Sequence, residues 1–472
     1  MEMSRSSFGL LLLLGILFVS SYAAADSVYD TFVQCLSSHS APSDQASSIV
    51  YAQTNSSFIK VLQSYIRNQQ FNTSSTPKPL IIVTPSDESQ VQAAIICPRN
   101  IGIQLRIRSG GHDYDGLSYI SDVPFFILDM FNLRSISVNI NDKTAWVLAG
   151  ATLGELSYRI WEKSKVHGFP VGICPTLGVG GHFSGAGYGY MLRRYGLSVY
   201  HVVDAQIVNV NRSILDRKSM GEDLFWAIRG GGGASFGVIL SYKIKLVRVP
   251  EIVTVFRVEK TLAQNATGIV YQWQHITDKI DNDIFMRLLL LPITVKSDKG
   301  SAKAEKIPKT IRVTLVSLFL GDTRPVLFHW IESVLYWANF DNGTSRKSDY
   351  VQKPISKDGL EGLWKTMIEL GKPGMVFNAY GGRMRNPLPS PRWEHIQDPV
   401  LDKKYLNLIR ELYSYITPFV SNSPRGTDSY EEGKVYGVKY FMNNFDRLVK
   451  VKTAVDPQNF FRYEQSIPPL PN

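Results

Sequence analysis

The chain has 472 residues, too many for one compact core, so we expect two domains or one large elaborated domain. Hydrophobic residues make up 44% and aromatic residues 11%, which excludes a disordered chain. The net charge of +10 is dispersed, and no nucleic-acid motif accompanies it. Such a charge favours retention on an anionic cell-wall matrix, and the alternative is that the basic pI is incidental.

The N-terminus has the pattern of a secretory signal peptide at residues 1–25. Arg5 precedes an apolar run at 8–19, and three alanines at 23–25 are suited to cleavage. The run is too short for a membrane span, and no later stretch approaches the required length. We therefore expect a secreted protein without a transmembrane segment, in the cell wall or apoplast, with the vacuole as the alternative location.

Glycosylation sequons and cysteines agree with export. Five sequons lie in polar or turn-like stretches and begin at Asn55, Asn72, Asn211, Asn265 and Asn342. Of three cysteines, Cys35 and Cys97 lie in ordinary segments and are expected to pair, and closing that loop would stabilise the fold by roughly 4 kcal/mol. Cys174 is then left over, a liability in an oxidising compartment unless a ligand occupies it.

Strand and helix patterns alternate up to residue 250. Strands are predicted at 78–85, 103–108, 125–130, 144–150 and 238–246, helices at 88–96 (capped by Asp87) and 152–163, and a hairpin at 202–216. The alternation predicts an α+β fold. No Gly-x-Gly-x-x-Gly stands between a strand and a helix, so a Rossmann-type domain is not expected.

The composition shifts after Pro250, where the glycine-rich runs stop. A helical stretch from about Asp428 to Val455 leads into a proline-rich end. We place a first domain at 26–250, a second at 251–427 and a C-terminal segment at 428–472.

Two glycine-rich loops carry the most informative side chains. His112 follows a basic turn at 108–111, and Cys174 opens a run of small residues at 177–188. Glycines let a backbone approach a flat or phosphorylated ligand closely, because no Cβ intervenes. A ring nitrogen and a thiol at the ends of two such loops can hold one cofactor from two sides. Taken singly, each residue has a simpler interpretation: His112 is then a turn residue and Cys174 a small buried hydrophobic residue.

Read together, these segments resemble the plant berberine-bridge-enzyme-like family, within the vanillyl-alcohol-oxidase (PCMH) type of FAD-binding fold. The matching stretches are 106–119, 174–189, 215–233, 444–453 and 456–470. The resemblance implies a two-part FAD-binding domain, 26–250 with 428–472, and an inserted antiparallel-sheet substrate domain flanked by helices. It also matches the family's N-terminal cysteine pair to Cys35 and Cys97.

The cofactor implied by this resemblance is an FAD attached twice. Its ring would be tied through the 8α carbon to His112 and through C6 to Cys174. The turn would offer backbone N–H groups to the pyrophosphate from Arg108, Ser109, Gly110 and Gly111. The other cofactor-binding residues expected by resemblance are Thr176, Gly178, Gly180, Gly181 and Asn459.

Catalytic residues are also expected from the resemblance. Tyr114 and Tyr188 match tyrosines that line the family's active site, with packing against the flavin as the alternative role. Leu177 stands where the family often has a valine thought to gate oxygen, so the bulkier leucine favours a dehydrogenase over an oxidase. We expect a structural role for His182 and no metal.

The likeness breaks at three places, all in the substrate domain. Family segments are missing between Asp322 and Trp330, after Met384 and after Gly426. The last gap removes the tyrosine usually proposed as the base. Either the gene model skips sequence, or this is a divergent member with impaired or altered catalysis.

Three functions remain open. The first is FAD-linked oxidation of an aromatic or allylic alcohol, or of a specialised metabolite, by hydride transfer to flavin N5. The second is the same chemistry on a carbohydrate. The third is a flavin-bearing protein without redox turnover, either a pseudoenzyme or a pericyclic catalyst. In each case we expect a monomer that takes a small-molecule substrate and no nucleic acid.

Overall fold

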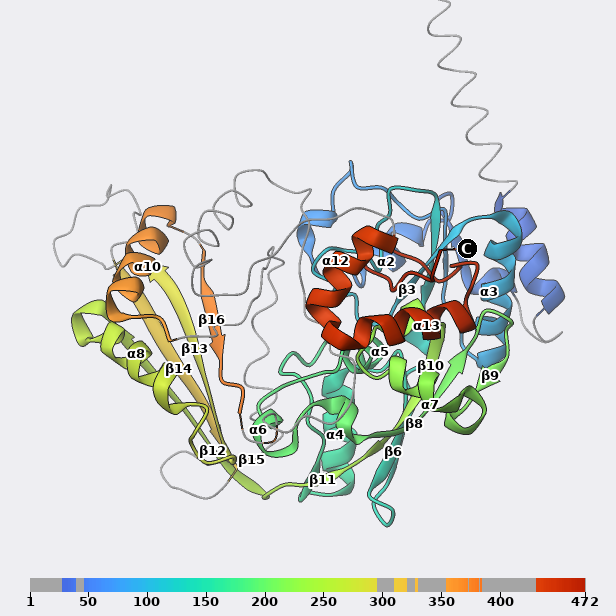
Figure 1. Cartoon of the computed structure of the whole chain (residues 1–472). Helices are drawn as coiled ribbons and strands as arrows, with labels where there is room; N and C mark the ends of the chain where they lie inside the picture. The colour runs from blue at the N-terminus through green and yellow to red at the C-terminus, as the bar shows by residue number, and fades with distance from the viewer. Residues whose placement is uncertain are drawn as a thin grey trace, which may run out of the picture.

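The computed structural model describes residues 28–39, 46–294, 310–320, 327–329, 354–371, 373–381, 383 and 430–471. Figure 1 shows two lobes that meet near β11 (Val247–Arg248). We call the described residues before 251, together with 430–471, the large lobe, and those from 251 to 383 the sheet lobe. Helices and sheets occur in both lobes, so the predicted α+β fold is confirmed.

Two sheets form the large lobe. In the first, of order β1-β2-β4-β3, β4 runs parallel to both β2 and β3, and the second, of order β5-β6-β10-β8-β9, is antiparallel throughout. The strands are β1 (Val50–Ala52), β2 (Ile81–Val83), β3 (Gln104–Arg108), β4 (Phe125–Asp129), β5 (Ile136–Asn139), β6 (Thr144–Leu148), β8 (Val202–Val208), β9 (Ile214–Leu215) and β10 (Val238–Lys245). A separate pair joins β7 (His167–Gly168) to β11.

Short and medium helices surround these sheets. The α-helices are α2 (Phe58–Gln63), α3 (Glu88–Ile101), α4 (Leu153–Lys163), α5 (Val179–Ser184), α6 (Leu192–Tyr195), α7 (Arg217–Ala227), α12 (Tyr430–Phe441) and α13 (Phe445–Val455). The 3-10 turns are η1 (Ala46–Ser48), η2 (Gln69–Phe71), η3 (Met130–Asn132), η4 (Ser198–His201), η5 (Gly233–Ser235) and η9 (Met442–Asn444). Residues 28–39 are also helical.

The predicted elements are confirmed, with one correction at a helix end. Asp87 caps α3 as expected, since its side chain accepts from Gln90 N. The helix does not stop at Ile96 but continues past Pro98 to Ile101, because the end is set by Gly102. Gly102 has φ +75°, a left-handed conformation that glycine adopts without strain.

The core of the large lobe joins both sheets to the end of the chain. One continuous cluster of buried side chains includes Leu128 from the first sheet, Val147 from the second and Leu448 from α13. Figure 1 shows α12 and α13, in red, lying against this lobe after the chain has passed through the sheet lobe. Segments from the two ends of the sequence therefore share one core.

The sheet lobe is one antiparallel sheet with helices against it. Its strand order is β15-β12-β14-β13-β16. The elements are β12 (Ile252–Thr261), η6 (Leu262–Gln264), α8 (Ala266–Ile276), β13 (Ile284–Ile293), β14 (Thr310–Phe319), β15 (Leu327–His329), α10 (Lys357–Leu370) and β16 (Met375–Asn378). Trp364 of α10 and Val270 of α8 pack with Leu288 of β13 in a separate buried cluster. The lobe thus has its own core.

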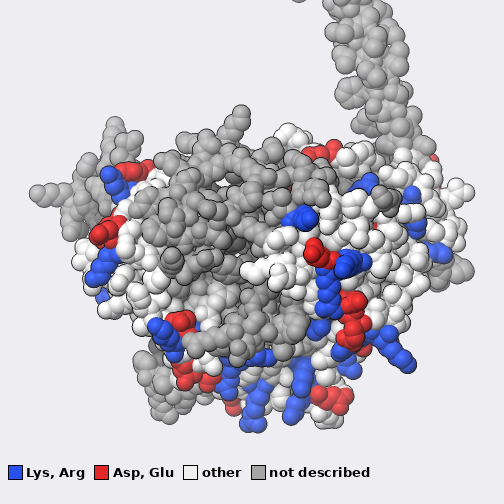
Figure 2. All heavy atoms as spheres, viewed as in Figure 1, with Lys and Arg blue, Asp and Glu red and all other residues white. Residues whose placement is uncertain are grey.

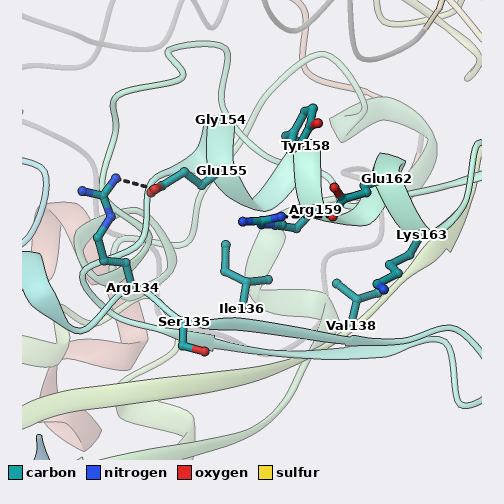
Figure 3. Close-up of a pocket in the computed structure, with 10 residues that line it drawn as sticks. All are labelled: Arg134, Ser135, Ile136, Val138, Gly154, Glu155, Tyr158, Arg159, Glu162 and Lys163. Atoms are coloured by element: carbon teal, nitrogen blue, oxygen red, sulfur yellow. Dashed lines mark hydrogen bonds and ion pairs between the residues drawn. The ribbon is translucent and has the colours of Figure 1, made fainter.

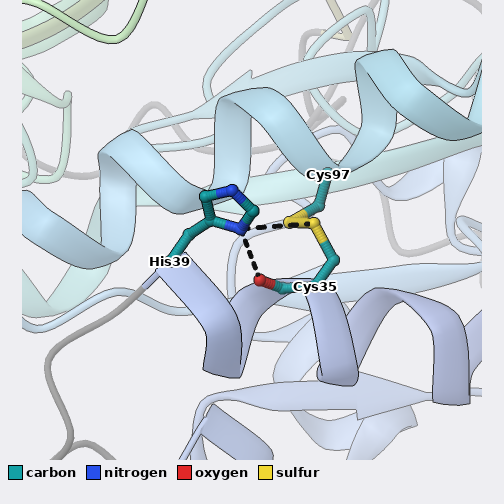
Figure 4. A group of neighbouring side chains, drawn as sticks. All are labelled: Cys35, His39 and Cys97. Carbon is teal, nitrogen blue, oxygen red and sulfur yellow. Dashed lines mark hydrogen bonds between the residues drawn. A yellow bond between two sulfur atoms is a disulfide. The ribbon is translucent and has the colours of Figure 1, made fainter.

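The predicted disulfide between Cys35 and Cys97 is confirmed, with a Cα–Cα distance of 5.8 Å. Figure 4 shows His39 beside it, with its Nδ1 2.9 Å from Cys35 O and 3.8 Å from Cys35 Sγ. These three residues are spaced closely enough to hold a metal ion, but the disulfide occupies both sulfurs. The bond ties the helical residues 28–39 to α3.

Several sequence expectations concern the surface or the chain ends. The sequon asparagines that the structure describes are exposed: Asn55, Asn72, Asn211 and Asn265. Asn342, the signal peptide at 1–25, and the gaps after Asp322, Met384 and Gly426 lie outside the described residues. Within the described part of the chain, no helix has the length and apolarity needed to cross a membrane.

Candidate functional site

The two glycine-rich loops lie directly against each other. A Cβ on Gly110 would stand 2.3 Å from Gly178 N, and a Cβ on Gly178 would stand 2.1 Å from Ser109 Oγ. Ser109 Oγ is itself held by a 2.7 Å bond to Ala149 O. Such separations are far below contact distance, so the loops meet only because both positions are glycine.

Gly111 is constrained even more tightly. Its φ is +66°, and a Cβ there would lie 1.8 Å from Tyr65 O. The turn that precedes His112 therefore requires glycine for both its conformation and its packing.

A side-chain contact connects the same two loops. His112 Nε2 lies 2.8 Å from Thr176 Oγ1, and Thr176 is two residues after Cys174. The bond crosses 64 positions of sequence. The structure therefore brings together the histidine and cysteine segments that the sequence analysis had linked.

The Cys174 loop is anchored by its backbone. Leu177 N donates to Cys174 O at 3.2 Å, Leu153 N donates to Leu177 O at 2.9 Å, and Gly180 N donates to Ala149 O at 3.1 Å. Cys174 is a half-buried thiol outside the disulfide. Leu177 is half-buried against the main core, and Gly181 is exposed, with no atom within 4 Å of where its Cβ would stand. The loop thus has one packed side and one open side.

Arg108 contributes to this region structurally. Its fully buried guanidinium pairs with Asp129 Oδ2 at 2.7 Å and donates to Leu62 O at 2.7 Å and Val61 O at 3.0 Å. Only its backbone is available to a ligand, which is the role that the sequence analysis gave it. The side chain holds the end of β3 in place.

His182 is structural, as expected. Its Nε2 accepts a hydrogen bond from Gly172 N at 3.0 Å, which requires the neutral ring. Burial lowers the pKa of His182 to about 4. The residue therefore stabilises the chain just before Cys174 and is not a proton donor at neutral pH.

The C-terminal segment adds a buried polar cluster. Lys452 Nζ contacts Asp456 Oδ2 at 2.6 Å, Ser235 O at 2.7 Å and Phe461 O at 2.7 Å. Asn459 follows with φ +52°, and its Oδ1 is buried with no hydrogen-bond partner among the described residues. An orphaned buried acceptor is rare and points to a missing ligand or water. Together with the glycine-walled loops, Asn459 fits the FAD that the sequence implied.

The two candidate catalytic tyrosines occupy different surroundings. The Tyr114 main chain is fixed by Asn68 Nδ2, which donates to Tyr114 O at 2.8 Å. Tyr188 is 41% exposed, and its ring lies 6.3 Å from that of Tyr380. Tyr380 belongs to the sheet lobe, so this pair connects the lobes.

Sequence reasoning missed the sheet-lobe side of this region. Besides Tyr380, Arg287 of β13 lies with its guanidinium carbon 5.5 Å from the ring centre of Tyr190. Arg287 Nε is held by Asn378 Oδ1 at 2.6 Å. No local pattern in the sequence predicts contacts between positions so far apart.

The family models match both parts of the large lobe. The model described as an FAD binding domain matches residues 79–216, and the one described as berberine and berberine like matches residues 405–468. Berberine bridge enzyme-like 21 of Arabidopsis thaliana is 51% identical, over 98% of this chain and 97% of the relative. Tetrahydroberberine oxidase of Berberis wilsoniae is 44% identical, over 99% of each chain.

Solved structures agree. Phl p 4, a grass pollen allergen with glucose dehydrogenase activity, superposes with a TM-score of 0.82 at 32% identity, over 93% of this chain and 100% of the allergen. The structure of berberine bridge enzyme from Eschscholzia californica gives a TM-score of 0.82 at 31% identity, over 93% and 99% of the two chains. The fold is thus shared with these solved structures.

The alignment with the Arabidopsis relative runs over 533 residues, more than the 472 of the whole chain. That relative therefore carries internal segments with no counterpart here, which agrees with the gaps noted in the sequence. With the shared fold, the paired glycine loops and a relative 51% identical along nearly its whole length, this chain belongs to the berberine bridge enzyme-like family of FAD-binding oxidoreductases.

Proposed function

We propose that the protein is a secreted FAD-dependent dehydrogenase whose flavin is attached through both His112 and Cys174. We propose further that it oxidises an aromatic or allylic alcohol, or a specialised metabolite, by hydride transfer to flavin N5. The observation that carries the proposal is the contact between the two loops, in which His112 Nε2 lies 2.8 Å from Thr176 Oγ1.

The residues of this chain would hold the cofactor as follows. When bound, FAD accepts a hydride at its ring N5. Backbone N–H groups at 109–111 would donate to its pyrophosphate. Asn459 Oδ1, an acceptor, would take a hydrogen bond from an N–H or O–H group of the FAD. His112 and Cys174 would fix the ring from two sides, so that it neither dissociates nor tilts.

The double attachment has a direct test. The secreted protein is precipitated with acid, and the flavin spectrum of pellet and supernatant is measured for wild type, His112→Ala, Cys174→Ala and the double variant. We expect flavin to stay in the pellet for wild type and for each single variant, and to be released only from the double variant. Release from wild type would refute covalent attachment.

An aromatic substrate is supported by the rings at the junction of the lobes. Tyr188 and Tyr380 are both more than one-third exposed, so their rings offer apolar faces to a flat substrate. Tetrahydroberberine oxidase, a 44% identical relative, is named for a substrate of this kind. The region where the family carries its catalytic base lies outside the described residues, so we assign no base.

Leu177 supports the proposal that the enzyme is a dehydrogenase and not an oxidase. It lies in the same loop as Cys174, where its bulk would restrict access of oxygen to the ring. In Phl p 4, which has glucose dehydrogenase activity, an isoleucine-to-valine variant is a glucose oxidase, so a single methylene can decide oxygen use. We expect Leu177→Val to raise the rate of oxygen-dependent reoxidation of the reduced flavin, with little change in its reduction by substrate.

Carbohydrate oxidation is the second candidate, and the glucose dehydrogenase activity of Phl p 4 favours it. Anaerobic bleaching of the flavin by aromatic alcohols or by sugars would separate the two. If no donor in a broad panel bleaches the flavin, the non-redox alternative stands, and the segments missing from this chain would explain it.

Export and glycosylation belong to the same proposal. The four described sequon asparagines are exposed, and the Cys35–Cys97 disulfide is typical of oxidising compartments. Mass measurement before and after enzymatic removal of N-glycans tests this part on its own.

A further inference from the structure

The last residues of the chain lie across β3, the strand that leads into the first glycine loop. We call residues 462–467 the C-terminal clasp. Gln104 Nε2 donates to Arg462 O at 3.2 Å, and Arg106 Nη2 lies 2.6 Å from Glu464 Oε1. Each contact crosses 358 positions of sequence, and Figure 1 shows the red C-terminal end of the chain beside β3. The end of the chain is therefore joined to the strand that positions the first loop.

The clasp also reaches the residues just after His112. Gln465 Nε2 donates to Asp115 Oδ2 at 2.7 Å. Asp115 N in turn donates to Asp113 Oδ1 at 2.9 Å, and Asp113 is the residue that follows His112. The loop that carries His112 is therefore supported on its C-terminal side by the clasp, in addition to the glycine packing on its N-terminal side.

The clasp is itself anchored in the core of the large lobe. At its end, Ile467 N donates to Ser235 Oγ at 3.2 Å, and just before its start, Phe461 O accepts from Lys452 Nζ at 2.7 Å. Ser235 and Lys452 are both buried. The clasp is therefore a fixed support for β3 and the His112 loop, and not a free tail.

The buried side chain of Arg106 gives Glu464 its importance. Arg106 is 2% exposed, and its Nε and Nη1 are buried with no hydrogen-bond partner among the described residues. A buried charge is costly unless an opposite charge accompanies it. Glu464, whose side chain is 39% exposed, supplies that opposite charge from the clasp. The pair therefore fixes the clasp on β3.

A second carboxylate competes for Arg106. Burial raises the pKa of Asp113, and the positive charge of Arg106 opposes that rise, so the guanidinium lies within electrostatic reach of Asp113. Without the charge of Glu464, Arg106 would turn toward Asp113 as a nearby carboxylate. Asp113 would then be drawn away from Asp115 N, and His112 beside it would move.

The Cys174 loop has a different support. Leu153 N of α4 donates to Leu177 O at 2.9 Å. Gly154 N, the next in α4, donates to Pro175 O, also at 2.9 Å. These anchors belong to α4 and not to the clasp. A change in the clasp should therefore act on one of the two proposed attachment residues and spare the other.

We propose that Glu464 is a positioning residue for the attachment of the flavin to His112. The inference rests on the proposed double attachment and adds what directs one of its two links. Forming this link replaces a C–H bond of the 8α methyl group and an imidazole N–H bond by one C–N bond. The two protons and two electrons released pass to the ring and then to molecular oxygen, which becomes hydrogen peroxide. Glu464 takes no part in these transfers and acts by keeping His112 in place.

The test measures each link separately in the full-length secreted protein. Cys174→Ala leaves only the His112 link, and His112→Ala leaves only the Cys174 link. Glu464→Gln is introduced into both backgrounds, and covalent flavin per polypeptide is measured after acid precipitation. Glu464→Asp, which keeps the charge, tests rescue. Gln465→Ala is a second variant, which removes the bond to Asp115 and leaves the ion pair of Arg106 in place.

The matched control is Glu162→Gln, which also replaces one carboxylate of an ion pair. Glu162 Oε2 lies 3.1 Å from Arg159 Nη1, and both residues line a cavity of about 590 Å³ between α4 and β5 (Figure 3). Figure 2 shows acidic side chains interleaved with basic ones at the molecular surface. The loss of a single exposed carboxylate should therefore change the surface field little.

In the Cys174→Ala background, we expect Glu464→Gln to lower covalent flavin at least about threefold, because bond formation depends steeply on the placement of the reacting atoms. Gln465→Ala should act in the same direction, and Glu464→Asp should retain most of the flavin. In the His112→Ala background, and for Glu162→Gln in both backgrounds, covalent flavin should change less than about 1.5-fold.

Two results would overturn the role of Glu464. Equal losses in the two backgrounds would mean that Glu464 acts on folding as a whole, and no loss in either would mean that His112 does not depend on the clasp. Failure of the proposed attachment is a separate result, seen before Glu464 is changed. A Cys174→Ala parent without covalent flavin would refute the link at His112, and this inference with it.

Discussion

In the large lobe, the loops at 108–112 and 174–178 are fixed by backbone contacts that leave no room for a side chain, whereas the sheet lobe reaches the same region through side chains such as Tyr380 and Arg287. The first kind of contact fails when a single Cβ is added. The second kind tolerates replacement of a ring or a charge. We therefore expect cofactor binding to be sensitive to small changes in the large lobe, and substrate choice to vary with the sheet lobe.

Relatives support this division. The enzyme named for tetrahydroberberine and the allergen with glucose dehydrogenase activity act on unlike molecules, yet both align with more than nine-tenths of this chain. A scaffold that fixes the cofactor rigidly can carry different substrate walls.

The largest effect is expected from the buried ion pair of the large lobe. Arg108→Met would leave the Asp129 carboxylate without its cation in a fully buried position, and breaking such a pair costs about 3–5 kcal/mol. The matched variant in the sheet lobe is Arg257→Met, which breaks the exposed pair with Glu259 and should cost less than about 1 kcal/mol. Denaturant unfolding measures both. Similar losses in the two variants would contradict the division between lobes.

A glycine pair within one loop tests the role of backbone contact. Gly178→Ala places a Cβ 2.1 Å from Ser109 Oγ and 2.3 Å from Gly110 N, so we expect about 3 kcal/mol of destabilisation, the upper end for overpacking. The secreted protein should also contain less flavin. Gly181→Ala is the control, because its Cβ meets nothing within 4 Å. Normal flavin content and stability in Gly178→Ala would show that the loops do not need this close approach.

The sequence predicted most of the large lobe because its signals are local. Glycine runs, the cap at Asp87 and the spare cysteine each act over a few residues, and the structure has the disulfide and the elements where they were expected. The sequence pattern also placed His112 and Cys174 at one site, and in the structure the loops that carry them are in contact.

What the sequence could not predict depends on contacts between distant segments. Arg193 of α6 is an example. Its buried guanidinium donates hydrogen bonds to Thr277 O and Ile280 O of the sheet lobe, both at 2.6 Å. Tyr380 reaches Tyr188 in the same way. Nothing around either residue indicates its partner, because the folding of both lobes brings the partners together. The structural role of the Arg108 side chain escaped prediction for the same reason.

The pH dependence of stability should also have its source in the large lobe. His182 has a pKa of about 4 in the folded protein, against about 6.5 when unfolded, so the unfolded state binds the extra proton. Stability should therefore be lost as pH falls from about 6.5 to about 4, by roughly 3 kcal/mol in total. His182→Gln should remove this slope, whereas His275→Gln, at an exposed position in the sheet lobe, should keep it. Unfolding curves at several pH values decide the matter, and an unchanged slope in His182→Gln would rule out His182 as its source.

The smallest effect is expected where the lobes meet through rings. Tyr380→Leu removes a ring pair with Tyr188 that is worth about 0.5–1.5 kcal/mol, and Tyr380 is 37% exposed, so stability should fall by no more than that amount and flavin attachment should not change. If the pair forms part of the substrate wall, KM for an aromatic donor should rise by about twofold to tenfold, with the rate of flavin reduction at saturation nearly unchanged. Tyr380→Phe keeps the ring and should behave as wild type. A loss of bound flavin in Tyr380→Leu would mean that the sheet lobe also helps to hold the cofactor, and the division between the lobes would then fail.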